Sequence, residues 1–331
     1  MHELLESLSP DQKKKLVLMP EPEWEDPMLA MLTHNYFSDP GWVYDRKLDG
    51  ARCITYRKGD EIGLMSRTRH EMSVSFPEIR EAFAALPPGD YVLDGEIVAF
   101  RDDETDFQML QPRLGVINPD EARATGIPVF YYLFDILYFD GYDVTQLWLT
   151  SRKSVLKGML PYRDPLRFIE SRRGDGLAYF KEACGKGWEG LIAKRAESPY
   201  QHRRSEDWLK FKCINQQEFV IGGFTDPHGK RIGLGALLLG YYDHGRLRYA
   251  GKVGTGFSDM TLKELIIKLK RLEIDISPFD EEVNEKEVHW VRPELVAEIG
   301  FENWTREGRL RQPRYRGLRY DKNPKDVVRE G

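Results

Sequence analysis

The chain has 331 residues, of which 41% are hydrophobic and 31% charged, and its formal net charge is −5. This composition is typical of a folded globular protein with room for two domains, and it excludes a chain too polar to fold. No run of about 20 apolar residues occurs, so no membrane-spanning helix is predicted, and the acidic balance does not by itself indicate a nucleic-acid-binding protein.

The three cysteines, Cys53, Cys184 and Cys213, are far apart and odd in number. They form no CxxC pair and no Cys/His zinc spacing, and we expect no disulfide framework. The first 15 residues are charged and lack the apolar core of a signal peptide. These features indicate a reducing, intracellular compartment.

In chain order, residues 1–30 are expected to form a leader, with a short helix within residues 1–16 followed by an extended, proline-containing segment. Strand signals, rich in β-branched and aromatic residues, then occur at residues 42–44, 52–57, 62–66, 91–100, 129–138, 190–194 and 208–213. Helical stretches are expected at residues 76–86 and 151–160. Strands with helices outside them predict an α+β domain over residues 1–213.

The pattern changes near residues 213–216, where we place the domain boundary. Short strands are expected at residues 218–224, 236–243 and 246–253, and again within 288–304. One helix is predicted over residues 259–272, because its leucines and isoleucine recur on one face. Glu294 and Glu298 are expected on a solvated helical stretch. Several short strands with one helix predict a small OB-fold β-barrel over residues 214–331.

Charge is unevenly distributed in this second part of the chain. Residues 305–325 contain eight Lys/Arg and two acids, whereas residues 273–287 contain seven acids and one lysine. The basic run is a candidate surface for phosphate groups, although such a run is as often a solvated face.

The candidate chemistry begins at Lys47-Leu48-Asp49-Gly50. A lysine amine attacks phosphorus only when it is deprotonated, and neighbouring cations or burial can lower its pKa. Glycine at the fourth position allows the chain to turn tightly beside a ligand. Alone, this four-residue pattern is a weak signal, because most matches are surface lysines in a strand and turn.

The residues that follow supply the other groups that nucleotidyl transfer needs. Glu96 and Glu189 are carboxylates that can hold a hard divalent cation. Lys210 and Lys212 are cations that can neutralise an α-phosphate and depress the pKa of Lys47. An aromatic ring such as that of Phe134 can stack on a purine.

This ordered set resembles the covalent nucleotidyltransferase superfamily, which contains DNA ligases, RNA ligases and mRNA-capping enzymes. The matching segments are Lys47–Gly50 with Arg52, Ser66-Arg67, Leu93–Val98, Phe134–Gly141, Trp188–Lys194 and Trp208–Lys212. Phe134–Gly141 is similar to the FDxLYxDG pattern of ATP-dependent DNA ligases. Residues 251–257, 301–305, 308–311 and 317–322 resemble the ligase domain of bacterial and archaeal ligase D or ligase C proteins.

The resemblance implies a role for each matching residue. Lys47 would carry AMP as a phosphoramidate, and Asp45 would read the adenine amino group, although the family more often has Glu there. Arg52 and Arg67 would contact ribose or the nick phosphate. Phe134 would stack on adenine, unless it is a core residue. The remaining matches are phosphate contacts at Lys194, Lys210 and Lys212, a ribose or metal carboxylate at Glu96, a metal carboxylate at Glu189, and pyrophosphate-orienting groups at Arg319 and Lys322.

The resemblance further implies an ATP-dependent DNA ligase that uses Mg²⁺ or Mn²⁺ and seals nicked or broken double-stranded DNA in repair or non-homologous end joining. Ku or another repair protein is an expected partner, a monomer the expected state, and the bacterial or archaeal cytoplasm, at the nucleoid, the expected location. A hinge is expected near residues 213–216.

Two alternatives remain open from the sequence. An RNA ligase or capping enzyme would share Lys47, Glu96, Glu189 and Lys212. A non-catalytic OB-type DNA-binding protein would not become labelled by ATP.

Overall fold

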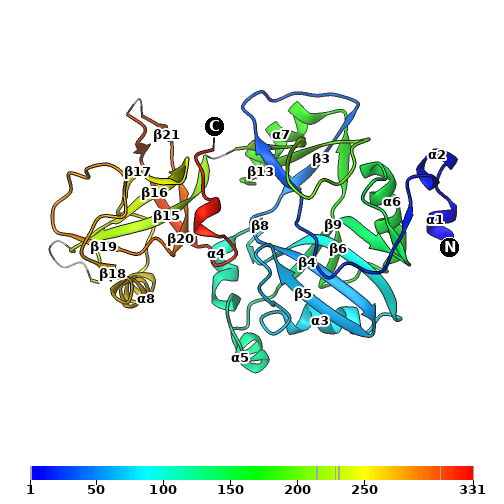
Figure 1. The fold of residues 1–331 in the computed structure, drawn as a ribbon, viewed down its shortest axis with the longest axis horizontal. Helices are drawn as coiled ribbons and strands as arrows, with labels where there is room; N and C mark the ends of the chain where they lie inside the picture. The colour runs from blue at the N-terminus through cyan, green and yellow to red at the C-terminus, as the bar shows by residue number, and fades with distance from the viewer. Residues whose placement is uncertain (1, 214, 228, 230–231, 306, 331) are drawn as a thin grey trace. The chain divides into compact units, whose positions relative to one another are not determined.

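The computed structural model describes residues 2–213, 215–227, 229, 232–305 and 307–330 (Figure 1). The chain divides into two compact units, Met1–Cys213 and Ile214–Gly331. Each unit has its own buried apolar cluster, so each is described separately.

The described part of the first unit contains two large sheets and one two-stranded hairpin. The larger has the order β1-β10-β9-β6-β4-β5. Its three long strands are β4 (Ala51–Gly59), β6 (Gly89–Val98) and β9 (Phe130–Phe139), which pair antiparallel. The shorter strands are β1 (Val17–Leu18), β5 (Glu61–Ser66), β10 (Tyr142–Asp143) and β11 (Leu166–Phe168), the last of which runs parallel to β9. Leu93 and Leu133 pack in one apolar cluster, whereas Val92 and Phe134 pack in another, as strand alternation requires.

The second sheet of this unit has the order β12-β3-β13-β14-β2. Its strands are β12 (Ser171–Arg173), β3 (Trp42–Lys47), β13 (Gly190–Arg195), β14 (Arg204–Lys212) and β2 (Leu29–Leu32). Leu191 and Phe211 belong to a cluster that includes residues of helix α7 (Gly176–Gly185). Ile192 packs in the cluster that contains Phe134. One face of the sheet therefore packs on a helix and the other faces the larger sheet.

Helices surround these sheets. They are α1 (Glu3–Glu6), α2 (Pro10–Lys13), α3 (Pro77–Ala84), α4 (Phe107–Leu110), α5 (Pro119–Ala124), α6 (Leu149–Met159) and α7, with a 3-10 turn η1 (Gln111–Arg113) after α4 and a short β7–β8 hairpin (Phe100–Arg101, Glu104–Thr105). The leader helix expected within residues 1–16 is instead two short ones. Ser9 caps a new helix that begins at Pro10, and proline cannot continue the preceding one.

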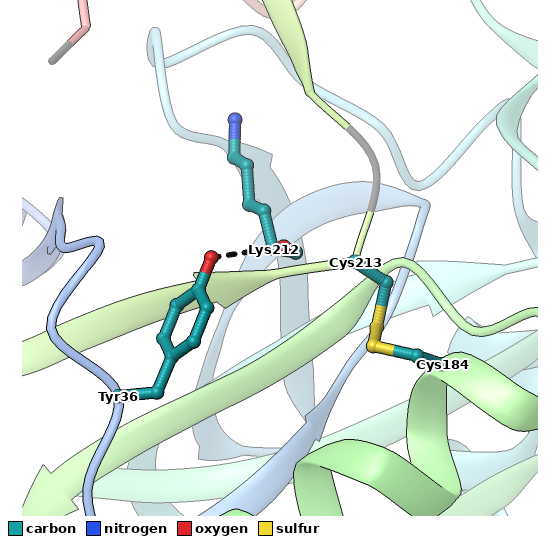
Figure 2. Close-up of a disulfide and its surroundings, with 4 residues drawn as sticks. All are labelled: Tyr36, Cys184, Lys212 and Cys213. Carbon is teal, nitrogen blue, oxygen red and sulfur yellow. Dashed lines mark hydrogen bonds between the residues drawn. A yellow bond between two sulfur atoms is a disulfide. The ribbon is translucent and has the colours of Figure 1, made fainter. Parts of the chain in front are cut away.

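The expectation that the cysteines form no disulfide is wrong for one pair. Cys184 and Cys213 are joined by a disulfide, with their Cα atoms 5.2 Å apart (Figure 2). They are 29 residues apart in sequence, but α7 packs beside β13, and β13 pairs with β14, so the end of the helix meets the end of β14. Cys53 is buried and carries a free thiol.

The second unit is built on β15 (Gln216–Thr225), which pairs with β16 (Leu237–Asp243) along one edge. Its other edge pairs with β20 (Val296–Gly300) in its first half and with β19 (Val288–Val291) in its second half. The remaining strands are β17 (Arg246–Val253), β18 (Glu273–Ile274), β21 (Asn303–Trp304), β22 (Leu310–Arg311) and β23 (Arg314–Leu318), followed by the 3-10 turn η2 (Pro324–Asp326).

The long helix α8 (Asp259–Lys270) of the second unit begins where Ser258 caps it. Leu262, Leu265 and Leu269 lie on its buried face, which matches the predicted periodicity. Glu298, expected on a solvated helix, lies on strand β20 and is only 6% exposed. Glu298 forms an ion pair with the buried Arg319. The two residues are 21 positions apart, so the sequence pattern around Glu298 does not indicate this contact. Glu294 is solvent-exposed as expected, but lies in a turn between strands.

Within the described ranges, none of the helices has both the length and the apolar composition that crossing a bilayer requires.

Candidate active site

Lys47 is the last residue of β3, and the segment that leads into β13 brings Glu189 beside it. The Lys47 amine and the Glu189 carboxylate form an ion pair, in which the side chains are 18% and 7% exposed. The lysine is therefore not a solvated surface residue, but is held against a carboxylate within the sheet that faces the larger sheet.

Gly190 separates Lys47 from Lys212. It pairs with Lys47 on β3 and with Lys212 on β14, so the two lysines flank a residue that has no side chain. Gly190 has φ +148°, and a Cβ atom there would lie 1.9 Å from the carbonyl oxygen of Phe211. Only glycine fits this position. Lys210 lies two residues before Lys212 on β14 and therefore on the same face of the sheet.

Gly50, the glycine of the lysine motif, lies in the bend between β3 and β4 and also allows a close backbone contact. A Cβ atom at this position would lie 2.3 Å from the carbonyl oxygen of Ile97 and 2.8 Å from a methyl of Val98. The glycine therefore permits a close approach of the segment after Lys47 to β6. Glu96, whose Cγ would lie 3.0 Å from that Cβ, is on the approached part of β6.

Arg52 and Glu96 face each other across β4 and β6. The Arg52 guanidinium forms two hydrogen bonds of 2.5 Å to the Asp94 carboxylate, which also accepts a hydrogen bond of 2.6 Å from the Tyr200 hydroxyl. Burial lowers the pKa of the Arg52 guanidinium, but the negative charge of Asp94, the hydrogen bonds to its carboxylate and smaller effects of neighbouring groups together raise it by a larger amount. The pKa of Arg52 therefore lies above its usual value. Arg52 is thus a fixed cation whose orientation depends on Asp94.

Phe134 on β9 is 8% exposed and belongs to a buried cluster, yet two cations lie over its ring. The Lys194 amine is 4.4 Å from the ring centroid and the Arg52 guanidinium 4.7 Å. Trp208 meets the ring edge-on at 6.1 Å. A ring between cations, with Ile192 in the same cluster, is compatible with either core packing or base stacking.

Asp45 lies two residues before Lys47 and is only 2% exposed. Its carboxylate pairs with Lys194 at 2.7 Å and with Lys153 of α6 at 3.5 Å, and it accepts a hydrogen bond from the Ser171 hydroxyl. Burial raises the pKa of Asp45, but Lys153 and Lys194 outweigh it and hold the pKa below its ordinary value. Burial lowers the pKa of Lys153 to about 8.

The surroundings of Asp45 contain contacts that the sequence did not indicate. Lys194 was expected at a phosphate, but its amine is engaged by Asp45 between the rings of Phe134 and Trp208. Lys153 and Ser171 complete the Asp45 environment and were not expected at all. No local signal marks them, because Ser171 reaches Asp45 through the pairing of β12 with β3, and Lys153 reaches it from a helix.

Arg67 follows the end of β5 in a turn that the Ser66 hydroxyl stabilises by accepting hydrogen bonds from the backbone N–H groups of Thr68 and His70. It is half-buried. Ser66 pairs with Cys53 on β4, so Arg67 lies next to the strand that carries Arg52.

Two predicted residues lie in the second unit. Arg319 is buried and forms ion pairs with Glu298 at 2.8 Å and with Asp321 at 2.9 Å. The Lys322 amine lies 2.7 Å from the Glu218 carboxylate. Arg309 pairs with Glu281 at 2.8 Å, so the basic and acidic runs of the sequence neutralise each other in part.

Two family models match the chain. One is described as ATP dependent DNA ligase domain and matches residues 27–212. The other is described as ATP dependent DNA ligase C terminal region and matches residues 230–322. The α+β domain and the OB-type domain predicted from the sequence are therefore confirmed.

Curated relatives include the "Multifunctional non-homologous end joining protein LigD" of Pseudomonas aeruginosa, which is 39% identical over 320 residues. The "Multifunctional non-homologous end joining DNA repair protein LigD" of Mycobacterium tuberculosis is 38% identical over 295 residues. These alignments cover 94% and 87% of this chain but only 37% of each relative. The chain thus spans little more than a third of the length of these proteins.

Among solved structures, "mycobacterial DNA ligase D complexed with ATP and MES" is similar with a TM-score of 0.66 and 35% identity. The similarity covers 92% of this chain and 98% of that one.

Proposed function

Because this chain belongs to the family of ATP-dependent DNA ligases, we propose that it joins 5′-phosphate and 3′-hydroxyl ends of DNA through an adenylate carried on Lys47. The observation that carries this proposal is the position of the Lys47 amine, held by Glu189 and separated from Lys212 only by Gly190. A nucleophile beside a carboxylate and a phosphate-binding cation is what nucleotidyl transfer requires.

The reaction has three steps. The Lys47 nitrogen attacks the α-phosphorus of ATP, a P–N bond forms, and pyrophosphate leaves. An oxygen of the DNA 5′-phosphate then attacks the same phosphorus and releases the lysine. Finally, the 3′-hydroxyl attacks the DNA phosphate, a phosphodiester bond forms, and AMP leaves. Lys47 must lose a proton before the first step, and the Glu189 carboxylate already accepts a hydrogen bond from its amine.

The remaining residues act by position and charge. Lys210 and Lys212 are proposed to bind the phosphate groups of ATP and later of the DNA end. Phe134 and Ile192 are proposed to sandwich adenine, and Asp45, held by Lys153, Lys194 and Ser171, to read its amino group. Arg52, held by Asp94, and Arg67 are proposed for the ribose or the nick phosphate. Arg319 and Lys322 are proposed to orient the pyrophosphate, after exchanging their present carboxylate partners.

A divalent cation, Mg²⁺ or Mn²⁺, is proposed at Glu189 and Glu96. Carboxylate oxygens are the donors that such hard cations prefer. Within the described residues, no three His, Cys, Asp or Glu side chains are grouped closely enough to form a metal cage. Phosphate oxygens and water would therefore complete the coordination, as is usual for Mg²⁺. The cation would offset the negative charge that accumulates during transfer.

The test is covalent labelling of the intact protein by ATP. Incubation with ATP and Mg²⁺ should add the mass of one adenylyl group, and Lys47→Ala should abolish the addition. Lys58→Ala removes an exposed lysine near the end of β4, the strand that follows Lys47 in sequence. It is the matched control and should be labelled normally. Normal labelling of Lys47→Ala would overturn the proposal.

The DNA substrate separates this function from its alternatives. Nicked DNA should be sealed faster than nicked RNA, and GTP should not replace ATP. The names of the curated bacterial relatives favour end joining as the pathway. Ku as a partner and the bacterial nucleoid as the location are further parts of this proposal. Joining of linear DNA should then be stimulated by Ku, whereas sealing of a single nick should not require it.

A further inference from the structure

The disulfide lies beside two groups of the active site. Cys213 directly follows Lys212 and is the last residue of the first unit. Cys184, near the end of α7, precedes Glu189 by five residues. Figure 2 shows Lys212 next to the bridge, which joins α7 to the end of β14.

The backbone at Lys212 is held from several sides. The Tyr36 hydroxyl donates a hydrogen bond of 3.3 Å to the Lys212 carbonyl oxygen (Figure 2). The N–H of Cys213 donates one of 3.0 Å to the Glu189 carbonyl oxygen. The Tyr36 ring in turn packs at 4.3 Å from that of Phe180 on α7. The helix, the tyrosine and the strand end therefore form one packed group, and the disulfide is its covalent link.

The bridge is also accessible to a reductant. Cys184 is exposed and Cys213 is half-buried. Cys53, by contrast, is fully buried, and burial raises the pKa of its thiol, which keeps it in the unreactive neutral form. Inside cells, disulfides are rare, and those that form are usually transient, catalytic or redox-sensing.

We propose that Cys184–Cys213 is a reversible thiol–disulfide site that controls adenylate formation by fixing or loosening Lys212. This inference rests on the proposed function. A thiolate of a dithiol reductant attacks the Sγ of Cys184, which belongs to the more exposed residue of the pair, the S–S bond breaks, and Cys213 leaves as a thiolate that takes up a proton. The second thiol of the reductant then attacks the mixed disulfide and releases Cys184 as a thiol. Two electrons pass to the protein, and the reductant becomes a disulfide.

Reduction is expected to slow the first step. Without the bridge, only hydrogen bonds and packing hold the end of β14 at Lys212. Misplacing a catalytic group by about 1 Å costs on the order of 100-fold in rate. Hydrogen bonds from the Tyr36 hydroxyl and the Cys213 N–H remain after reduction, so we expect a smaller displacement of Lys212 and an adenylation rate that falls roughly tenfold.

The experiment compares one preparation of the full chain in two redox states. Half is treated with dithiothreitol, which is then removed, and half is left oxidised. Alkylation after denaturation counts the thiols, with one modified cysteine expected for the oxidised protein and three for the reduced protein. Adenylate formation is followed by intact mass at a temperature where both forms remain folded by circular dichroism.

The variant Cys184→Ser/Cys213→Ser should match the reduced protein and be unaffected by dithiothreitol, which excludes an effect through Cys53. Equal adenylation rates in the two states, or a bridge that dithiothreitol opens only after unfolding, would overturn the inference while the proposed function stands. Absence of adenylate in both states would overturn the proposed function itself, and the thiol count would still report the bridge.

Discussion

Asp45 shows how one buried carboxylate can hold side chains from several elements together. It is buried with two lysines and a serine hydroxyl, so its charge is needed to balance cations that cannot reach water. Lys153 and Lys194 supply the counter-charges, and the Ser171 hydroxyl donates a hydrogen bond. The residue therefore has a structural role as well as the recognition role proposed for it.

Asp45→Asn should destabilise the first unit strongly, because it leaves two buried ammonium groups without their counter-charge. Removing one partner of a buried ion pair costs about 3–5 kcal/mol. Urea unfolding at pH 7 measures this loss, and the KM for ATP should rise in the same variant. Asp164→Asn breaks a largely exposed ion pair with Arg167 and should cost less than about 1 kcal/mol. Similar losses in the two variants would contradict the prediction.

Glu21 gives the protein a predictable pH dependence. Burial, and next the charge of Asp90, raise the pKa of Glu21 to about 7 from an ordinary value of 4.5. The folded state therefore holds this proton more tightly than the unfolded state. The stabilisation is fully present below pH 4.5 and is lost as the pH rises through 7.

Glu21→Gln should consequently be more stable than the natural protein at pH 7.5, and the difference should shrink toward pH 4.5. Thermal unfolding at several pH values measures it. Glu23→Gln changes an exposed residue two positions away and should show no such trend. A pH-independent difference for Glu21→Gln would show that its carboxyl does not titrate as described.

The charged site residues that lie within short motifs were predictable from the sequence. Lys47, Glu189 and Lys212 lie within runs whose order indicated nucleotidyl transfer, and β13 brings them together. The partners that orient the site were not predictable. Lys153 and Ser171 have no motif, because their contribution depends on which elements lie against β3.

At the scale of elements, α6 is fastened to β9 by a fully buried ion pair. Arg152 donates hydrogen bonds of 2.7 and 3.0 Å to the Asp135 carboxylate, and further ones to the carbonyl oxygens of Leu147 and Ser198. Both side chains of the pair are completely inaccessible to solvent. Asp135 follows Phe134, so this pair also fixes the strand that carries the ring.

Arg152→Met should destabilise the protein by about 3–5 kcal/mol, because it leaves the buried Asp135 carboxylate without a counter-charge. Adding Asp135→Asn to it should restore part of the loss, because the uncompensated charge disappears. Denaturant unfolding of both variants tests this. Arg123→Met, which breaks an exposed pair with Glu81, should change stability by less than about 1 kcal/mol. If the double variant is less stable than Arg152→Met, the explanation is refuted.

Elements with a strong local pattern were predictable, and those that depend on tertiary contacts were not. Helix α8 has both periodic leucines and a serine cap. Helix α7 lacks a side-chain cap and begins at a glycine, so its sequence gave little sign of it. Glu298 was assigned to a helix because the strand β20 is defined by its neighbours β15 and β23 rather than by alternation, and all its residues are buried.

At the scale of the whole molecule, the net charge is negative, whereas some local regions are positively charged. The chain carries −5 overall, yet the proposed site gathers Lys47, Lys210 and Lys212, and the second unit exposes Arg311 and Arg314. Binding to DNA phosphates must therefore rely on local patches, within a molecule whose average field repels nucleic acid.

DNA affinity should consequently fall steeply with salt, because each neutralised phosphate releases counter-ions. We expect nicked-duplex binding to weaken by at least roughly tenfold between 50 and 200 mM salt. Fluorescence anisotropy with two duplexes of unrelated sequence measures this, and both should respond alike, since backbone contacts do not read bases. A flat salt response would argue against recognition through phosphates.

Gly190 illustrates how a residue without chemistry can be the least replaceable in a site. It has no functional group, but any side chain would collide with the Phe211 carbonyl oxygen and fill the space between two lysines that lie only two strand spacings, about 10 Å, apart. A saturation-mutagenesis screen for ligation should therefore find this position intolerant to every substitution, alanine included. Such intolerance would reflect how closely the backbone of β14 approaches β13 at this point.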